Sequence, residues 1–328
     1  MRAIFDTVVK RDEDASVNAF IDKILHARPD LADATFYAPS QGKNSLTVMT
    51  ADEVFKPPNR PEDAAHFLKE YKFLEHMSGC NLGLAVPAVT HPAGEDGGFY
   101  GMTRLPGEPL TRALLESLPQ EEQEKIADDL ARFNARFITA LTEGDRQNLG
   151  LDSVQVLRPL SPQEVTAALA APHMRETLGT DYEAAVRLAK QYADGFNEAR
   201  EKSRSVMIHS DLHPGNILYD REQKKLAVID LGSGRAIAVD MGFSPLNHSY
   251  PPAWMDRYLD TFGKESGLDV TRVQIEAKKC LYGIRYLAQN PNDEKAAAFC
   301  KGEIQQWKKT VAEAPVESKP AAAQKHDL

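Results

Sequence analysis

Residues 206–232 read VMIHSDLHPGNILYDREQKKLAVIDLG. Three short apolar runs alternate with polar segments in this stretch, and they lie at residues 206–208, 217–219 and 226–229. This alternation predicts three strands joined by a polar loop and a charged turn. Four polar side chains follow or separate the runs: His209, Asp211, Asn216 and Asp230. Because a rigid scaffold commonly holds reacting groups at strand ends, the stretch predicts a functional site.

The spacing of these polar residues suits the transfer of a phosphoryl group. This chemistry needs a carboxylate that orients or deprotonates the attacking hydroxyl, and oxygen ligands for Mg²⁺ on the nucleotide phosphates. The catalytic loop of kinases supplies them as H-x-D-x-x-x-x-N, and a later aspartate binds the metal. His209, Asp211 and Asn216 fit this register. Asp230 follows an apolar run, as the second metal ligand should.

The same residues carry a family resemblance. HSDLHPGNILYD followed by VIDLG resembles the catalytic core of the aminoglycoside phosphotransferase and choline kinase-like family, whose fold is related to protein kinases. The resemblance implies that Asp211 is the catalytic base and that His209 orients its loop. It implies that Asn216 and Asp230 bind Mg²⁺, and that Asp240 braces the loop. The sequence departs from the family's pattern at Ser210 and at Leu231-Gly232, and neither departure removes a reacting group.

Lys56 and Glu70 are the candidates for a kinase-like Lys–Glu pair. Lys56 ends the apolar run 54–55, and Glu70 lies at the edge of the apolar face of a helix expected between Pro61 and Gly79. In kinases such a pair holds the lysine against the α- and β-phosphates. The alternative is two exposed surface charges, which are common in any protein.

Two further segments complete the expected nucleotide site. In the loop 39–44, Ser40, Gly42 and Asn44 are candidates to contact phosphate, although a single glycine departs from G-x-G-x-x-G and a plain hairpin turn is the alternative. The strand expected at 98–104 resembles the segment that leads into the family's hinge. The resemblance implies that four residues present backbone groups to adenine: Met102, Thr103, Arg104 and Leu105.

The resemblance implies an α+β, two-lobed protein-kinase-like fold. A small antiparallel β-rich N-lobe, residues 1–104, would bind nucleotide, and a larger helical C-lobe, residues 105–311, would carry the catalytic loop and the acceptor site. Residues 312–328 are rich in Ala, Pro and Lys and are expected to be disordered. Apolar periodicity predicts helices at 16–27 (with Ser16 as N-cap), 110–118, 120–141, 161–178, 181–202 and 270–311, the last broken near residue 290.

Composition limits the function classes. The chain has 328 residues, 42% of them hydrophobic and 27% charged, and a net charge of −9. The acidic balance argues against nucleic-acid binding and is compatible with a cationic substrate. Three cysteines lack metal-like or redox-like spacing, and the first residues do not resemble a signal peptide. No stretch approaches the roughly 18 apolar residues of a membrane span. A cytoplasmic protein without membrane partners is therefore expected.

We predict a small-molecule kinase. It would use Mg²⁺ to transfer the γ-phosphoryl group of ATP or GTP to a hydroxyl of a small acceptor such as an aminoglycoside or amino alcohol. A nucleotide-binding regulator without transferase activity is one alternative. A metal-dependent hydrolase is another, because His209, Asp211 and His213 alternate along the chain. A protein kinase is disfavoured because there is no Ala-Pro-Glu element and little room for an activation loop. The oligomeric state stays open.

The sequence allows two interpretations of a group of three aromatic residues. Tyr250, Trp254 and Tyr258 recur on one face of a predicted helix. They could line the acceptor pocket, because pockets are largely apolar and aromatic. The alternative is ordinary packing in the core.

Overall fold

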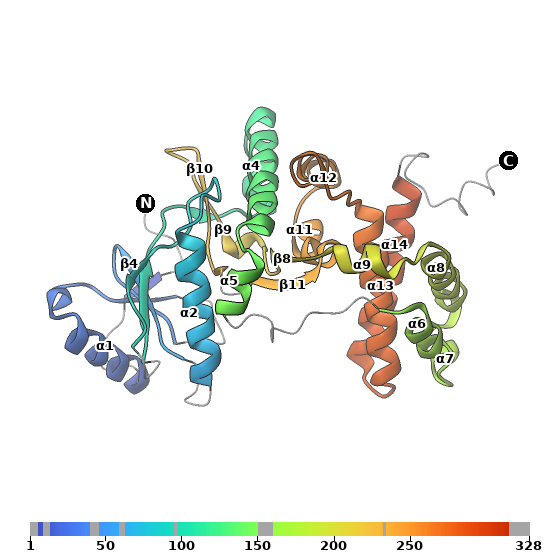
Figure 1. Cartoon of the computed structure of the whole chain (residues 1–328), viewed down its shortest axis with the longest axis horizontal. Coiled ribbons are helices and arrows are strands. Elements are labelled where there is room, and N and C mark those ends of the chain that lie inside the picture. Colours follow the sequence, from blue (N-terminus) through green and yellow to red (C-terminus); the bar gives the residue numbers. More distant parts are fainter. Residues whose placement is uncertain are drawn as a thin grey trace. The chain divides into compact units, whose positions relative to one another are not determined.

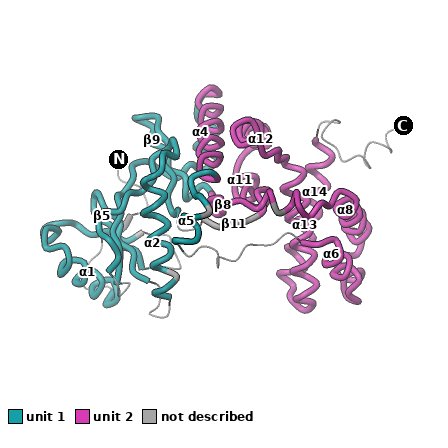
Figure 2. Tube along the Cα trace, in the orientation of Figure 1, with its two compact units in different colours: residues 1–118, 139–154, 213–234 teal, residues 119–138, 155–212, 235–328 magenta. Residues whose placement is uncertain are grey.

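The computed structural model describes residues 6–8, 14–39, 46–58, 63–94, 98–149, 160–231 and 234–314. The chain folds into two compact units whose segments interleave along the sequence (Figure 2). Unit 1 comprises residues 1–118, 139–154 and 213–234, and unit 2 comprises residues 119–138, 155–212 and 235–328.

Unit 1 contains a six-stranded sheet with the strand order β1-β2-β3-β4-β6-β5, in which all neighbours are antiparallel. The strands are β1 (Asp6–Val8), β2 (Tyr37–Pro39), β3 (Val48–Met49), β4 (Glu53–Lys56), β5 (Val89–His91) and β6 (Tyr100–Thr103). The antiparallel β-rich lobe expected from the sequence is therefore confirmed. Strand β6 is shorter than the strand predicted at 98–104, because the residues on either side of it are irregular.

The two faces of this sheet have different roles. Side chains alternate along a strand, so Phe55 and Lys56 of β4 point to opposite faces. On one face, Phe55 packs with Phe99 and with α1 (Ala15–Ala27). Lys56 pairs in register with Tyr100, and Tyr100 stacks on Phe67 of α2 (Ala64–Ser78), with ring centroids 5.1 Å apart. The alternation therefore directs Lys56 to the side that α2 covers, which also carries Glu70.

The start of α1 differs from the prediction. Asp14, and not Ser16, is the N-cap, because its carboxylate accepts hydrogen bonds from the backbone N–H groups of Ser16 and Val17 at 2.8 and 3.2 Å. Both residue types cap helices well. The aspartate lies one residue before the helix, whereas Ser16 is already inside its first turn.

A second, three-stranded sheet of unit 1 has the order β10-β9-β7. Its strands are β7 (Glu108–Pro109), β9 (Ile217–Asp220) and β10 (Lys225–Val228), and they join two segments more than 100 residues apart in the sequence. The other described helices of this unit are the 3₁₀ helices η1 (Pro29–Leu31) and η5 (Pro214–Asn216), and α3 (Arg112–Glu116) and α5 (Glu143–Asn148).

We expect Gly107→Ala to destabilise the protein by at least about 1–2 kcal/mol, the cost of a left-handed backbone for a residue with a Cβ. Gly107 has φ +117°, and a Cβ there would lie 2.9 Å from the backbone carbonyl carbon of Tyr219 in β9. Urea unfolding measures the loss. Gly195→Ala is the matched control, because its Cβ would meet nothing within 4 Å. Equal stability of the two variants would contradict the prediction.

Within the residues that the structure describes, unit 2 is helical apart from one pair of strands, β8 (Ser205–His209) and β11 (Gly234–Ala238). Its helices are α4 (Gln120–Thr139), α6 (Pro162–Leu169), α7 (Met174–Leu178), η4 (Gly179–Asp181), α8 (Tyr182–Gly195), α9 (Glu198–Ser203), α10 (Val239–Gly242), α11 (Ser244–Ser249), α12 (Pro252–Ser266), α13 (Arg272–Gln289) and α14 (Glu294–Glu313). A large apolar cluster joins α6, α7, α8, α13 and α14, and α13 and α14 lie side by side (Figure 1). Within the described chain, no helix has the length and apolar character needed to cross a membrane.

Helix continuity in unit 2 was predicted only in part. The break near residue 290 is confirmed, since α13 ends at Gln289 and α14 begins at Glu294. The single helices predicted at 161–178 and 181–202 are wrong, because each is divided into two. Pro172 lies in the first interruption, where a proline cannot continue the helical hydrogen bonds. The second interruption follows Gly195.

Tyr250, Trp254 and Tyr258 pack in the core of unit 2, as the alternative interpretation held. All three are buried, and the ring of Trp254 lies 4.6 and 5.9 Å from those of Tyr250 and Tyr258. The Tyr258 hydroxyl accepts a hydrogen bond from Asn134 Nδ2 at 2.8 Å. These contacts account for the aromatic stripe without a ligand.

Candidate active site

The β9–β10 hairpin of unit 1 brings Asn216 and Asp230 to one end. Ile217 pairs with Val228 in the antiparallel register, so the residues just outside this pair are also neighbours. The backbone N–H of Ile229 donates to the carbonyl oxygen of Asn216 at 3.0 Å. Two oxygen-bearing side chains, 14 positions apart in the sequence, therefore leave the same end of a rigid hairpin.

Asp230 has an unusual backbone conformation. Its φ is +60°, in the left-handed region. Residues other than glycine seldom adopt this region, and Asp and Asn are the most frequent exceptions. Such strain persists only where the surrounding structure imposes it, and it gathers at functional sites. The conformation therefore marks Asp230 independently of the sequence motif.

Lys56 lies between two carboxylates of unit 1. Its ammonium Nζ is 3.0 Å from Asp230 Oδ1 and 3.6 Å from Glu70 Oε1. The hydroxyl of Tyr100 donates to the same Glu70 oxygen at 3.4 Å. Tyr100 is fully buried, and it lies opposite Lys56 in the sheet. The β4–β6 register and helix α2 together fix the position of the ammonium.

The electrostatics of this group favour a charged lysine. Burial alone would lower the pKa of Lys56, but the Asp230 carboxylate, followed by Glu70, outweighs it and raises the pKa above its usual value. Burial raises the pKa of Tyr100 well above its usual value, and the negative charges of Glu70 and Asp230 add to this. Lys56 is therefore a fixed positive charge and Tyr100 a neutral hydrogen-bond donor at neutral pH.

A cavity of about 740 Å³ in unit 1 contains most of the predicted nucleotide-site residues. Its lining includes Lys56, Met102, Thr103, Arg104, Leu105, Asn216 and Asp230. Glu70 is not part of the lining, but its carboxylate contacts Lys56, which is. Ser40, Gly42 and Asn44 lie outside the described residues.

Sequence reasoning missed several residues of the cavity. They are Tyr37, Thr47, Met49, Pro87, Leu218 and Ile229. Met49 and Val54 are paired neighbours on β3 and β4, and both line the cavity, so the apolar residues of these two strands would have supplied a signal. Arg104 donates from Nη1 to the Thr50 carbonyl at 2.8 Å, and its guanidinium lies 5.8 Å from the centre of the Tyr37 ring. These contacts fix one wall of the cavity.

In unit 2, strand β8 positions the segment that contains Asp211. The imidazole of His209, at the end of β8, is completely buried and lies 6.2 Å from the Phe137 ring. Its Nδ1 accepts a long hydrogen bond, 3.4 Å, from the backbone N–H of Asp211. Leu212 is also buried, while Asp211 itself is exposed. Buried neighbours on both sides thus hold an accessible carboxylate.

Asp240 and Arg204 form a buried ion pair in unit 2. Both side chains are less than one-tenth exposed, and the guanidinium donates to Asp240 Oδ1 and, at 2.7 Å, to the backbone carbonyl of Asp269. Burial raises the pKa of Asp240, although Arg204 opposes that shift. The pair ties α10 to the start of β8, which leads to Asp211.

We expect Arg204→Met to destabilise the protein by about 3–5 kcal/mol, because it leaves the buried Asp240 carboxylate without its counter-ion. Urea unfolding at pH 7 measures the effect. Arg112→Met is the control, since Arg112 forms an exposed i,i+4 pair with Glu116 that contributes no more than about 0.5 kcal/mol. A loss for Arg204→Met as small as that of the control would refute the structural role of the pair.

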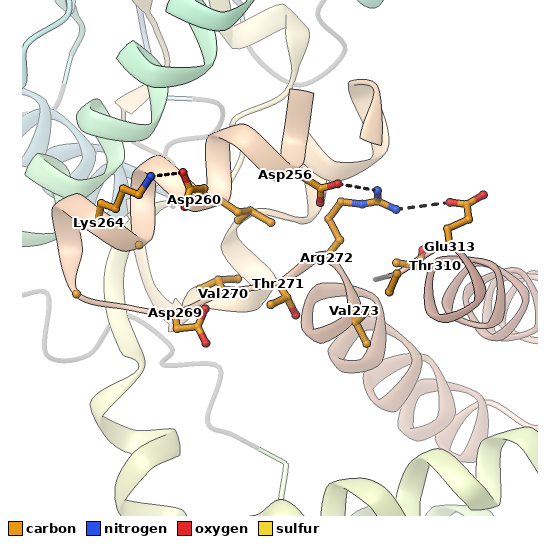
Figure 3. Close-up of a pocket in the computed structure, with 14 residues that line it drawn as sticks. Asp256, Asp260, Lys264, Asp269, Val270, Thr271, Arg272, Val273, Thr310 and Glu313 are labelled. Atoms are coloured by element: carbon orange, nitrogen blue, oxygen red, sulfur yellow. Dashed lines mark hydrogen bonds and ion pairs between the residues drawn. The ribbon is translucent and has the colours of Figure 1, made fainter. Parts of the chain in front are cut away.

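Unit 2 contains a second large cavity, of about 750 Å³, lined by α12, α13 and α14 (Figure 3). Arg272 lies between Asp256 and Glu313, at 3.5 and 3.6 Å, and Lys264 pairs with Asp260. Both cationic side chains of this lining are thus engaged in ion pairs with its carboxylates. The lining includes none of the catalytic candidates, so the cavity in unit 1 is the better candidate for chemistry.

The chain matches a known protein family in sequence and solved structures in fold. A model of the phosphotransferase enzyme family matches residues 39–272. No curated protein sequence matches the chain. The chain is similar to the GDP complex of wild-type aminoglycoside 2'-phosphotransferase-IIIa, with 16% identity, a TM-score of 0.64, and coverage of 89% of this chain and 98% of the other.

Two more solved structures show the same fold. The streptomycin–ATP–APH(2'')-IIa ternary complex is 18% identical, with a TM-score of 0.58 and coverage of 88% and 96% of the two chains. The macrolide 2'-phosphotransferase MphH from Brachybacterium faecium is 15% identical, with a TM-score of 0.52 and coverage of 86% and 98%. The two-lobed kinase-like fold is thereby confirmed. Because the family model matches most of the chain, the protein belongs to the phosphotransferase enzyme family, as its catalytic-loop motif predicted.

Proposed function

We propose that this phosphotransferase moves the γ-phosphoryl group of ATP or GTP to a hydroxyl group of a small molecule. The observation that carries the proposal is the position of Lys56, which is held 3.0 Å from Asp230 and 3.6 Å from Glu70. Lys56 and Asp230 line a cavity that also contains Met102–Leu105. In this proposal residues 1–104 bind nucleotide, and residues 105–311 carry the catalytic loop and the acceptor site.

The nucleotide would occupy the cavity of unit 1. Backbone groups of Met102–Leu105 would contact the base, and the Lys56 ammonium would contact the phosphates. The Asn216 amide and the Asp230 carboxylate supply hard oxygen ligands at one end of the hairpin, which suits Mg²⁺. When bound, Mg²⁺ would offset the negative charge of the phosphates. Solved relatives that contain GDP or ATP support a nucleotide donor.

Asp211 would act on the acceptor. Its carboxylate would accept the proton of the acceptor hydroxyl while the new oxygen–phosphorus bond forms. The bond between the γ-phosphorus and the bridging oxygen breaks, and the nucleoside diphosphate leaves with that oxygen. His209 touches no substrate in this scheme, and its buried ring holds the segment that presents Asp211.

An aminoglycoside or another amino alcohol is the acceptor class that we propose. Similar structures are complexes with kanamycin, streptomycin and gentamicin. The net charge of −9 also suits a cationic molecule. A macrolide is the next class to test, since macrolide 2'-phosphotransferases share the fold. We propose a cytoplasmic location, which suits three cysteines without a disulfide.

The test is nucleotide turnover with Mg²⁺, ATP or GTP, and a panel of aminoglycosides, amino alcohols, macrolides, sugars and nucleosides. Stimulation by one class, with a phosphorylated product in the mass spectrum, would support the proposal. Nucleotide binding without any transfer would favour the alternative of a regulator. The absence of both nucleotide binding and nucleotide turnover would overturn the proposal. Family membership leaves no support for the hydrolase that the alternation of His209, Asp211 and His213 suggested.

A further inference from the structure

Three helices of unit 2 bring together a group of side chains that the proposed reaction does not use. His248 comes from α11, Glu276 from α13 and Glu303 from α14. One ligand atom from each of them lies within 4.8 Å of the other two. His248 is exposed, whereas Glu276 and Glu303 are buried. The group therefore has a solvent-facing imidazole above two buried carboxylates.

Glu276 is an incompletely satisfied buried carboxylate. Its side chain has no exposed surface, and its Oε1 accepts a hydrogen bond from Asn247 Nδ2. Its Oε2 receives no hydrogen bond from any residue that the structure describes. Glu303 Oε2 is also buried, and it is paired with the ammonium of Lys279 at 2.7 Å. Burying acceptors of this kind is costly unless a partner compensates.

One lysine faces both carboxylates. Lys279 Nζ lies 2.7 Å from Glu303 Oε2 and 3.8 Å from Glu276 Oε2, and it is itself buried. One ammonium faces two carboxyl groups, so the two acids are not both matched by a base within the cluster. Arg272, on the first turn of α13, is already engaged by Asp256 and Glu313. The cluster thus has the charge and the donor atoms to accept a further cation.

We propose that His248, Glu276 and Glu303 bind one divalent transition-metal ion, of which Zn²⁺ is the representative probe. An imidazole nitrogen with carboxylate oxygens is a donor set for Zn²⁺, whereas Mg²⁺ and Ca²⁺ prefer oxygen ligands alone. Ligand atoms at roughly 2.1 Å from one ion lie no more than about 4.2 Å apart. The side chains therefore close onto the ion by small rotations, and a fourth position remains for water.

The neighbours of the cluster have defined roles in this site. Asn247 holds Glu276 by its Oε1 and leaves Oε2 free for the ion, as outer-shell partners of metal ligands do. Lys279 competes with the ion, because its ammonium occupies the space between the two carboxylates and repels a second cation. The bound ion would fasten α11, α13 and α14 together and stabilise unit 2.

The experiment is a Zn²⁺ titration of the full chain after treatment with a chelator, followed by calorimetry and by the thermal unfolding midpoint. The wild-type protein is expected to bind Zn²⁺ and to unfold at a higher temperature with it. Glu276→Gln keeps an acceptor for Asn247 but removes a ligand, and we expect at least the roughly 10–100-fold weakening that outer-shell changes cause. Glu294→Gln, an exposed carboxylate on the same helix as Glu303, is the control and should match wild type.

Two further variants keep the proposal falsifiable. His248→Ala changes an exposed residue, so the chain should fold, and it should lose affinity as Glu276→Gln does. Lys279→Met removes the competing ammonium and should strengthen Zn²⁺ binding. No stabilisation of wild type by Zn²⁺, equal stabilisation of Glu276→Gln and wild type, or weaker binding by Lys279→Met would each overturn the proposed site.

Discussion

Asp211→Asn is expected to lower kcat by about 10²–10⁴-fold, the usual contribution of a positioned general base. The affinity for nucleotide should be unchanged, because the variant alters neither the cavity of unit 1 nor the candidate metal ligands. The variant should also fold normally, since Asp211 is exposed while His209 and Leu212 beside it are buried. Steady-state turnover and calorimetric titration with Mg²⁺ and nucleotide measure the two quantities separately.

The control for this substitution is Asp194→Asn, which removes an exposed carboxylate from α8 of the same unit. It should retain the turnover of the wild-type protein. Wild-type turnover by Asp211→Asn would show that another group accepts the hydroxyl proton. A joint loss of turnover and nucleotide affinity would indicate that Asp211 acts in binding.

Asp230→Asn is expected to weaken Mg²⁺-dependent nucleotide binding by about 100-fold or more, because changes to the outer-shell partners of a metal already cost about 10–100-fold and this variant changes a candidate ligand itself. Asparagine is the informative replacement, since it tolerates the left-handed backbone that Asp230 adopts at φ +60°. Alanine would add backbone strain to the loss of the ligand. Titration with nucleotide in Mg²⁺ and in a chelator separates the metal-dependent part.

Glu222→Gln is the matched control, because this exposed carboxylate lies at the turn end of the same hairpin. Its nucleotide affinity should equal that of wild type in both conditions. If Asp230→Asn kept the full difference between Mg²⁺ and chelator, Asp230 would not be a metal ligand. Asp230 would then serve mainly as the counter-ion of Lys56.

Much of the hairpin and its site could be predicted because the relevant signals are local. The apolar runs of residues 217–219 and 226–229 define β9 and β10, and the antiparallel register then places Asn216 and Asp230 at one end. The position of Lys56 at the end of β4 is also a local signal. Its contact with Asp230, 174 residues away, depends on tertiary structure that no local pattern contains.

Other features could not be predicted, either because two residues were equally good candidates for one role or because the residues that meet lie far apart in the sequence. Asp14 and Ser16 are both of residue types that cap helices well, so the sequence alone did not decide between them. The division of the helix predicted at 161–178 into α6 and α7 is a different case, because Pro172 marks it in the sequence. His248, Glu276 and Glu303 share no motif spacing, because they come from three different helices.

The interleaving of the two units has a consequence for synthesis on the ribosome. The segment 213–234 supplies two of the three strands of the second sheet in unit 1, and β7 has no partner in that sheet until β9 exists. At about 5–20 residues per second, the chain between residues 118 and 234 takes roughly 6–23 seconds to emerge. We therefore expect unit 1 to complete its fold late, because its first 118 residues are synthesised well before the segment 213–234 that pairs with them.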